Sequence, residues 1–164
     1  VRLCGGNDAT ILPAHTEYSV LQLIGEVGTD LTKWPTEKHF TAWAGLAPAS
    51  AQSGKRKRSV KRRRNRTGRL FCVMARALAR SNKIALGGFY RRMAARKGGL
   101  LANVALARKL AELFWRVMVK GIEYVEKGLA DYEEKLLETK RRALNRLAKQ
   151  LGRELVPVPT VKLA

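Results

Sequence analysis

Residues 101–127 read LANVALARKLAELFWRVMVKGIEYVEK, and this stretch decides the fold class. Its apolar residues, among them Val104, Leu110, Phe114 and Val117, recur at the three- and four-residue intervals of a helix with one buried face. Strand signals are nearly absent from the whole chain. The sequence therefore predicts an all-α fold of about five to six helices. The other helical runs cover about residues 16–27, 36–44, 69–78, 86–96 and 132–151.

Polar and glycine residues mark the ends of these runs. Thr16 and Thr36 are typical N-cap residues, and Gly28 is a typical helix stop. Aromatic residues at helical spacing are expected in the core, whereas Trp34 is the aromatic residue expected at the surface. The expected core aromatic residues are Trp43, Phe71, Phe89 and Trp115. We predict an irregular lead-in over residues 1–15, a helical domain over 16–127, and a helical arm with an extended tail over 128–164.

The excess charge of the chain lies in one segment. Residues 38–111 hold 20 of the 33 Lys and Arg residues and no Asp or Glu, while the rest of the chain has 13 bases and 13 acids. Residues 46–67 have no hydrophobic period and predict a long basic loop between the second and third helices, and ten of the twenty residues 51–70 are Lys or Arg. A solvated charge run is the alternative, but nucleic acid is the first expected partner and an anionic membrane surface the second.

Several classes of protein are excluded by the same residues. A segment without carboxylates cannot supply a carboxylate metal site or a carboxylate general base. Cys4 and Cys72 lack metal-ligand spacing, and no disulfide framework is indicated, so a reducing, cytoplasmic compartment is expected. No apolar run approaches the roughly 18–20 residues that span a bilayer, and no signal peptide is visible. We therefore expect no membrane partner.

Three features of the sequence are candidates for a chemical site. Gly25 and Gly28 form a GxxG pair that permits close approach of a phosphate, although a helix C-cap explains them more simply. Cys72 lies within an apolar helical stripe and is expected to be a buried, unreactive thiol. Ser53 is followed by glycine and four bases, a setting in which guanidinium groups can stabilise a phosphoryl transition state, although Ser-Gly is also ordinary loop composition.

Residues 23–58, LIGEVGTDLTKWPTEKHFTAWAGLAPASAQSGKRKR, resemble the C-terminal transposase domain of the insertion-sequence 110 family, the bridge-RNA-guided recombinases. The resemblance extends over about residues 17–155, and its C-terminal part is similar to the subgroup typified by insertion sequence 1111. The positions that carry it are Ile24-Gly25-Glu26-Val27-Gly28, Trp34, Phe40, Trp43, Gly45-Leu46-Ala47-Pro48, Ser53-Gly54-Lys55, Arg64-Asn65-Arg66, Phe89-Tyr90-Arg91-Arg92-Met93, Val104–Lys109 and Gly128-Leu129-Ala130-Asp131-Tyr132-Glu133.

The resemblance implies a DNA recombinase domain in which Ser53 is the nucleophile for strand cleavage and rejoining. It also implies a guide RNA and an acidic, resolvase-like N-terminal domain that binds Mg²⁺, in cis or in trans. This chain is then inactive without that domain, and a homo-oligomer is expected. The residues expected to bind nucleic acid are Lys55, Arg56, Lys57, Arg58, Lys61, Arg62, Arg63, Arg64, Arg66, Arg69, Arg91 and Arg92.

One departure from the family pattern lies before the first helix. The family has a glycine-containing hairpin turn there, similar to Pro-Gly-Ile-Gly, whereas this chain has Pro13-Ala14-His15-Thr16. Glycine in such a turn lets backbone N–H groups reach a DNA phosphate. The alternative interpretations remain a non-catalytic nucleic-acid-binding module and a truncated transposase remnant. Residues 132–151 could instead serve as a dimerisation arm.

Overall fold

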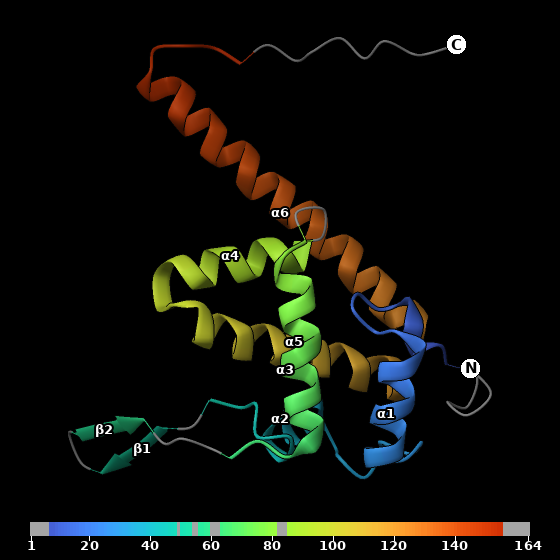
Figure 1. Cartoon of the computed structure of the whole chain (residues 1–164). Helices are drawn as coiled ribbons and strands as arrows, with labels where there is room; N and C mark the ends of the chain where they lie inside the picture. The colour runs from blue at the N-terminus through green and yellow to red at the C-terminus, as the bar shows by residue number, and fades with distance from the viewer. Residues whose placement is uncertain (1–6, 49, 54–55, 60–62, 82–84, 156–164) are drawn as a thin grey trace, which may run out of the picture. The chain divides into compact units, whose positions relative to one another are not determined.

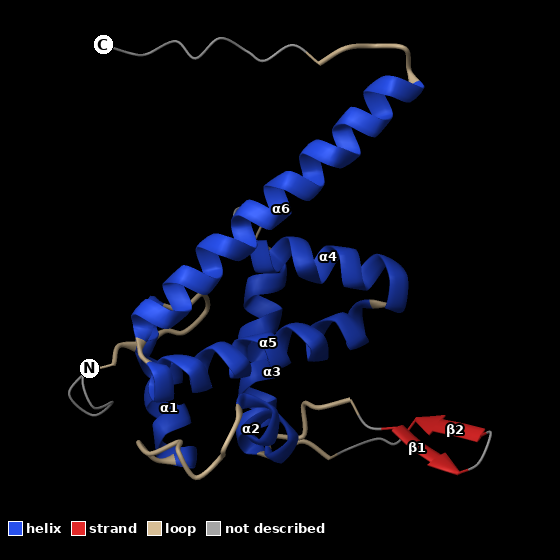
Figure 2. Ribbon diagram, turned by 180° about the vertical axis from the view of Figure 1, so that it is seen from behind, coloured by secondary structure: helices blue, strands red, loops and turns tan. Residues whose placement is uncertain are grey.

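Figure 1 shows the computed structural model of the chain, which describes residues 7–48, 50–53, 56–59, 63–81 and 85–155. For residues 50–53, 56–59, 126–133 and 136 it describes the backbone alone. The helices are η2 (Ala9–Ile11, a 3-10 turn), α1 (Glu17–Val27), α2 (Glu37–Trp43), α3 (Arg66–Ala79), α4 (Ala85–Lys97), α5 (Gly99–Lys120) and α6 (Ile122–Gln150). The predicted helical fold class is confirmed, and Figure 2 distinguishes these helices from the one short pair of strands in the described residues.

That pair of strands lies where the sequence predicted only a loop. β1 (Ser50–Ser53) and β2 (Arg56–Ser59) pair antiparallel, with Ser50 opposite Ser59 and Ser53 opposite Arg56. The prediction of an unstructured segment was therefore wrong for these eight residues. The sequence between the strands begins with Gly54, a residue that favours a two-residue hairpin connection. Because neither strand has alternating apolar residues, hydrophobic periodicity could not reveal them.

Helix α5 is the central element of the first unit of the chain, Val1–Lys127. It packs against α2, α3 and α4, and α3 in turn packs against α1. The rings of Phe40, Phe71 and Phe114 come from α2, α3 and α5 and meet with centroid separations of 6.0–6.3 Å. All three side chains are fully buried. Burial of aromatic and aliphatic side chains on these helices is the main favourable term in folding.

Local capping explains where α1 begins and ends. Thr16 Oγ1 accepts a hydrogen bond from the backbone N–H of Ser19, and Gly28 at φ 81° donates its N–H to the carbonyl of Ile24. The predicted caps at these two residues are confirmed. Thr36 differs, because its hydroxyl hydrogen-bonds the His39 ring at 2.8 Å and makes no side-chain bond to the backbone of α2.

The break between the last two helices is earlier than the sequence indicated. Helix α5 ends at Lys120, followed by Gly121 at φ 84°, whose N–H donates to the carbonyl of Val117. A positive φ costs glycine little, so the chain turns there and α6 begins directly at Ile122. The predicted helix ends at about residue 127 and start at about residue 132 were therefore wrong.

The second unit, Gly128–Ala164, contains most of α6. Leu137, Leu144, Leu147 and Leu151 are each more than half exposed along this helix. Glu138 and Arg142 form an ion pair one turn apart. Over the described residues, no helix combines the length and the apolar character needed to cross a bilayer.

Candidate nucleic-acid interface

Helix α3 presents a row of arginines to solvent. Arg66, Arg69, Arg76 and, directly after the helix, Arg80 recur at the spacing of one helical face, and all four are exposed. The opposite face is buried and includes Phe71, Met74 and Leu78. From Arg66 to Arg80 the row extends for about 21 Å at 1.5 Å per residue. We call Arg66, Arg69, Arg76 and Arg80 the arginine face, and an α-helix of this kind fits the major groove of B-DNA.

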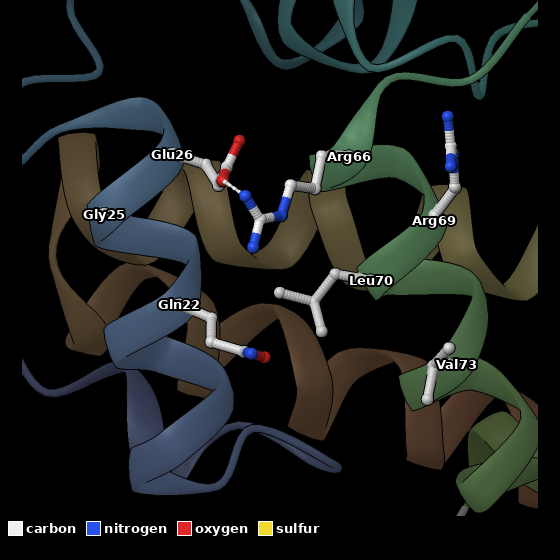
Figure 3. Close-up of a pocket in the computed structure, with 7 residues that line it drawn as sticks. All are labelled: Gln22, Gly25, Glu26, Arg66, Arg69, Leu70 and Val73. Atoms are coloured by element: carbon white, nitrogen blue, oxygen red, sulfur yellow. Dashed lines mark ion pairs between the residues drawn. The ribbon is translucent and has the colours of Figure 1, made fainter.

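A shallow groove of about 420 Å³ separates the arginine face from α1. Figure 3 shows Arg66 and Leu70 on α3 pointing across this space toward Gln22, Gly25 and Glu26 on α1. Arg69, one helical turn from Arg66, also lines the groove. Arg66 Nη1 lies 3.1 Å from Glu26 Oε1, and the arginine side chain remains 82% exposed. An exposed pair of this kind is weak, so an incoming phosphate can compete with Glu26 for the guanidinium.

The start of α3 is held against the end of α2 by close backbone contacts. Asn65 Oδ1 accepts the N–H of Gly68 at 2.8 Å as the N-cap of α3, and Asn65 Nδ2 donates to the carbonyl of Trp43 at 3.2 Å. A Cβ on Gly68 would lie 2.0 Å from the Ala44 carbonyl oxygen. A Cβ on Gly45, which has φ 72°, would lie 2.7 Å from the Arg63 carbonyl oxygen. Two glycines therefore permit the approach that positions the arginine face.

Ser53, the predicted nucleophile, is the last residue of β1, and its Cα is paired with that of Arg56. The backbone thus places the start of the basic strand β2 opposite the serine, since directly opposed residues in an antiparallel ladder have Cα atoms about 4.5–5.5 Å apart. Arg56, Lys57 and Arg58 belong to β2. Their side chains and that of Ser53 lie outside the described residues, as do Lys55, Lys61 and Arg62 entirely.

The remaining predicted basic residues lie on two other parts of the first unit. Arg63 is exposed just before α3, whereas Arg64 is half-buried and its Nε has no hydrogen-bond partner. Arg91 and Arg92 are exposed on α4, and Arg91 Nη1 donates to the carbonyl of Ser81 at 2.9 Å. The structure thus brings Arg63, Arg66 and Arg69 together at one end of α3, with Arg91 and Arg92 on the next helix.

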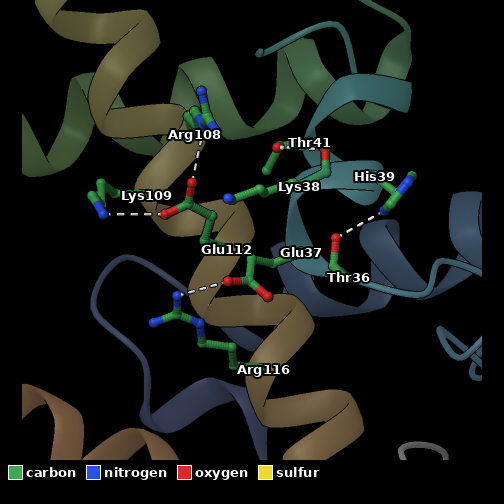
Figure 4. A network of polar contacts seen from close by, with 9 residues as sticks. All are labelled: Thr36, Glu37, Lys38, His39, Thr41, Arg108, Lys109, Glu112 and Arg116. Atoms are coloured by element: carbon green, nitrogen blue, oxygen red, sulfur yellow. Dashed lines mark hydrogen bonds and ion pairs between the residues drawn. The ribbon is translucent and has the colours of Figure 1, made fainter.

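Two bases at the end of the carboxylate-free segment are engaged by the protein itself (Figure 4). Glu112, 9% exposed, accepts hydrogen bonds from Arg108 Nε at 2.9 Å and Lys109 Nζ at 3.2 Å. Glu37 on α2 accepts from Arg116 at 3.0 Å. Burial acts to raise the pKa of Glu37, but the hydrogen bond from Arg116, a backbone hydrogen bond and the charges of Arg116 and Lys120 together outweigh it, and this pKa is lowered. The Arg116–Glu37 pair joins α5 to α2, whereas Arg108 and Lys109 pair with Glu112 within α5. Arg108 and Arg116 are therefore engaged in structural ion pairs.

Two of the three candidate chemical sites, the GxxG pair and Cys72, have simple structural explanations. Gly25 lies inside α1 and Gly28 caps it, so the GxxG pair is a helix end rather than a phosphate loop. Cys72 is half-buried, and burial raises the pKa of its thiol against the opposing fields of Arg64 and Arg76. A raised pKa leaves the thiol protonated and unreactive at neutral pH. The described residues contain no cluster of three His, Cys, Asp or Glu side chains that fits a metal ion.

The turn before α1 keeps a glycine-like backbone although it lacks glycine. Ala14 has φ 64°, the only positive φ of a non-glycine residue in the described chain. The next residue, His15, is 3% exposed, stacks on Phe114 at 5.9 Å, and has Nδ1 within 2.9 Å of the Pro13 carbonyl oxygen. Burial lowers the pKa of His15 to about 4, and its Nε2 has no partner. Ala14 thus adopts the left-handed conformation that glycine would adopt at lower cost.

Two residues that the sequence predicted to be buried are exposed. Trp43, predicted to lie in the core, is 44% exposed, and Val73, predicted on the apolar stripe of the third helix, is 65% exposed. Trp34, predicted at the surface, is partly buried because it packs on Phe40. The predicted core positions of Phe71 and Trp115 are confirmed, whereas Phe89 is only partly buried. The sequence signal that could have indicated an exposed Trp43 is its position two residues before Gly45, at the end of a short helix.

Comparison with known proteins gives one match. Neither a curated protein nor a solved structure matches the chain. A family model described as "Transposase IS116/IS110/IS902 family" matches residues 12–91. This confirms the resemblance over those residues, while the finer subgroup stays a prediction. The matched part contains the glycine-like turn, the hairpin and the arginine face, so the candidate interface lies within the residues that are similar to the transposases of the IS116/IS110/IS902 family.

Proposed function

We propose that this chain binds DNA through the arginine face and presents Ser53 of the β1–β2 hairpin to a DNA phosphodiester. The transposase domain over residues 12–91 implies a role in DNA transposition. The observation that carries the proposal is the exposed row of Arg66, Arg69, Arg76 and Arg80 within a segment that has no Asp or Glu. Each phosphate neutralised by such a residue releases counterions, so binding should weaken steeply with salt.

In the proposed reaction, Ser53 Oγ attacks the phosphorus in line and forms a phosphoserine ester. The bond between phosphorus and one deoxyribose oxygen breaks, and the released sugar leaves as a hydroxyl after taking up a proton. The serine proton passes to a general base, and a carboxylate in this role would come from outside residues 38–111, which have none. Nearby guanidinium groups would stabilise the additional negative charge on the phosphoryl oxygens. Rejoining is the reverse attack by a sugar hydroxyl.

A Mg²⁺ ion does not fit the described residues of this chain, because they hold no cluster of three potential ligands. The proposal therefore assigns any metal ligands to an acidic domain supplied in cis or in trans. A guide RNA and a second copy of the chain are further partners in this proposal. The exposed leucines of α6 support a contact between copies, since such a row is costly to leave in water.

The test is a covalent-adduct assay with labelled target DNA and the acidic domain supplied in trans. Wild-type protein should give a band that survives denaturation, and Ser53→Ala should abolish it. Ser59→Ala is the matched control, because Ser59 lies on the other strand of the same hairpin, opposite Ser50. An adduct of unchanged intensity with Ser53→Ala would refute the nucleophile assignment.

A non-catalytic binding module is the second candidate, favoured by the absence of a metal-ligand cluster in the described residues. It predicts salt-sensitive DNA binding by wild-type protein and no adduct even with the acidic domain present. DNA binding and adduct formation therefore need to be measured on the same preparation. Binding without an adduct would select this second candidate.

A further inference from the structure

Two tryptophans form a partly exposed aromatic surface beside the end of α2. The rings of Trp34 and Trp43 lie 4.8 Å apart with an interplanar angle of 49°, and Trp34 packs edge-on against buried Phe40 at 5.0 Å. Trp43 is 44% exposed although it is among the largest apolar side chains in the first unit. We call Trp34 and Trp43 the tryptophan pair. An exposed ring of this size loses favourable burial, so it indicates a binding role.

The segment that carries Trp34 is fixed before any ligand binds. Trp115 Nε1 donates to the carbonyl of buried Leu31 at 3.3 Å, and the Trp34 N–H donates to the same carbonyl at 3.1 Å. Asp30 Oδ1 accepts from the Thr32 N–H and hydroxyl at 2.8 and 2.6 Å. These bonds hold the turn in one conformation, so little conformational entropy would be lost when a ligand stacks on the pair.

Positive charge borders the tryptophan pair on both sides. Lys33 Nζ lies 4.4 Å from the Trp34 ring centroid while donating to the Val27 carbonyl at 2.6 Å. On the other side, Asn65 bonds the Trp43 carbonyl, and the backbone of Arg63 and Arg64 lies against Gly45. Arg63 lies two residues before Asn65 and Arg66 directly follows it, and both are exposed. Cationic residues therefore lie close to both tryptophans.

We propose that the tryptophan pair is a stacking site for an unpaired nucleobase, with the phosphates on either side of that base held by Lys33 and by Arg63 or Arg66. The proposal deepens the proposed function and rests on its nucleic-acid binding. A nucleobase offers a flat apolar face to the exposed part of the Trp43 ring, and its phosphates carry charge opposite to that of the neighbouring cations. A duplex exposes such a face only at its ends, so the site selects single-stranded or unpaired nucleic acid.

Other occupants fit the same surface less well. A cationic ligand is disfavoured, because Lys33 already occupies a position over Trp34 and the neighbouring arginines repel positive charge. An apolar peptide would cover the rings but would offer no anionic group to the neighbouring cations. The charge of the surroundings thus favours a polyanion with aromatic faces.

The test compares binding of the full chain to four probes at one salt concentration. They are a single-stranded DNA and a single-stranded RNA of twelve nucleotides, a DNA duplex with the same number of phosphates, and inorganic polyphosphate. Trp43→Leu keeps an apolar side chain but removes the aromatic face, and Trp43→Phe keeps a smaller aromatic face. We expect Trp43→Leu to bind the preferred single strand about tenfold more weakly and Trp43→Phe to recover much of that loss.

Binding of the duplex and of polyphosphate by Trp43→Leu should change by less than about twofold, since these probes bind through charge. Comparing the single-stranded DNA with the single-stranded RNA shows which kind of nucleic acid supplies the base. Equal weakening for all four probes would mean that Trp43 only supports the fold, and it would overturn the proposal. Unchanged binding of both single strands by Trp43→Leu would overturn it as well.

Tryptophan fluorescence gives a second readout that does not depend on affinity. A single strand should quench wild-type emission more than polyphosphate does at equal saturation, and Trp43→Phe should lose most of that difference. If the proposed function were wrong, wild-type protein would bind neither the duplex nor the single strands. If the wild type binds the duplex but shows no single-strand quenching, only the stacking site is wrong.

Discussion

The side-chain amide of Asn65 bonds the Trp43 carbonyl with Nδ2 at 3.2 Å and the Gly68 N–H with Oδ1 at 2.8 Å. One residue therefore both caps α3 and ties it to the end of α2. The two roles use different atoms and can be separated by substitution.

Asn65→Asp keeps the capping oxygen and loses the donor to Trp43, whereas Asn65→Ala loses both. We expect Asn65→Ala to lower the free energy of unfolding by about 1–2 kcal/mol and Asn65→Asp to lower it by less. Urea denaturation followed by circular dichroism measures both values. Equal losses for the two variants would contradict the capping role of Oδ1.

Gly68 and Gly25 provide a matched pair of glycines inside helices. A Cβ on Gly68 would collide with the Ala44 carbonyl oxygen at 2.0 Å, whereas a Cβ on Gly25 would meet nothing within 4 Å. Gly68→Ala should destabilise the protein by about 3 kcal/mol or more, because backbone must move. Gly25→Ala should stabilise it by about 0.5–1 kcal/mol. Thermal unfolding distinguishes the two directions, and a stable Gly68→Ala protein would be incompatible with this packing.

Ala14 is held at φ 64°, where an L-residue pays about 1–2 kcal/mol that glycine does not. Ala14→Gly would remove this cost, but part of the stabilisation is offset because glycine also makes the unfolded chain more flexible. We therefore expect Ala14→Gly to raise the free energy of unfolding by up to about 1 kcal/mol. Chemical denaturation at neutral pH provides the measurement. A loss of stability would show that the left-handed conformation is not strained.

The stability of the fold should depend on pH through His15. Burial lowers the pKa of His15 from 6.5 to about 4, so between these values the unfolded chain binds a proton that the folded chain does not. Stability should therefore fall as the pH decreases from about 6.5 towards 4, by about 3 kcal/mol over the whole range. His15→Phe keeps an aromatic ring beside Phe114 and should remove this part of the pH dependence. Denaturation curves at several pH values for both proteins measure the difference, and identical pH profiles would exclude His15 as its source.

DNA binding should respond in opposite directions to changes at Glu26 and Arg69. In the wild type, Glu26 Oε1 lies 3.1 Å from Arg66 Nη1. Glu26→Gln removes this charge partner of the Arg66 guanidinium and should strengthen DNA binding at low salt. Arg69→Gln should weaken binding and reduce the slope of log K against log salt by about 1. Fluorescence anisotropy over a salt series measures both effects. A salt slope that Arg69→Gln leaves unchanged would place Arg69 outside the interface.

Much of the helical framework follows from the sequence, because its signals are local. Thr16 and Gly28 bound α1 as predicted, and the apolar stripe of α3 places Phe71 in the core. The break at Gly121 was missed because the apolar period continues across it, and only its positive φ distinguishes it from a helical glycine.

The candidate site was less predictable, since it depends on contacts between distant residues. The basic composition indicated a polyanion but could not show that Arg66 pairs with Glu26 or that Arg108 is engaged by Glu112. Trp43 appeared to complete an apolar face with Phe40, yet α2 ends at Trp43 and its ring remains partly in solvent. The hairpin carries no hydrophobic pattern from which its register could be derived.

The close approach of Gly45 to Arg63 has a consequence for how such proteins can diversify. This contact brings the two ends of the segment between α2 and α3 together. The positions of α2 and α3 therefore do not depend on how many residues the segment contains. The entropic cost of a longer closed segment grows slowly, by about 0.6 kcal/mol for each doubling of its length. A hairpin of different length or chemistry can therefore be exchanged at this position while the helical scaffold stays the same.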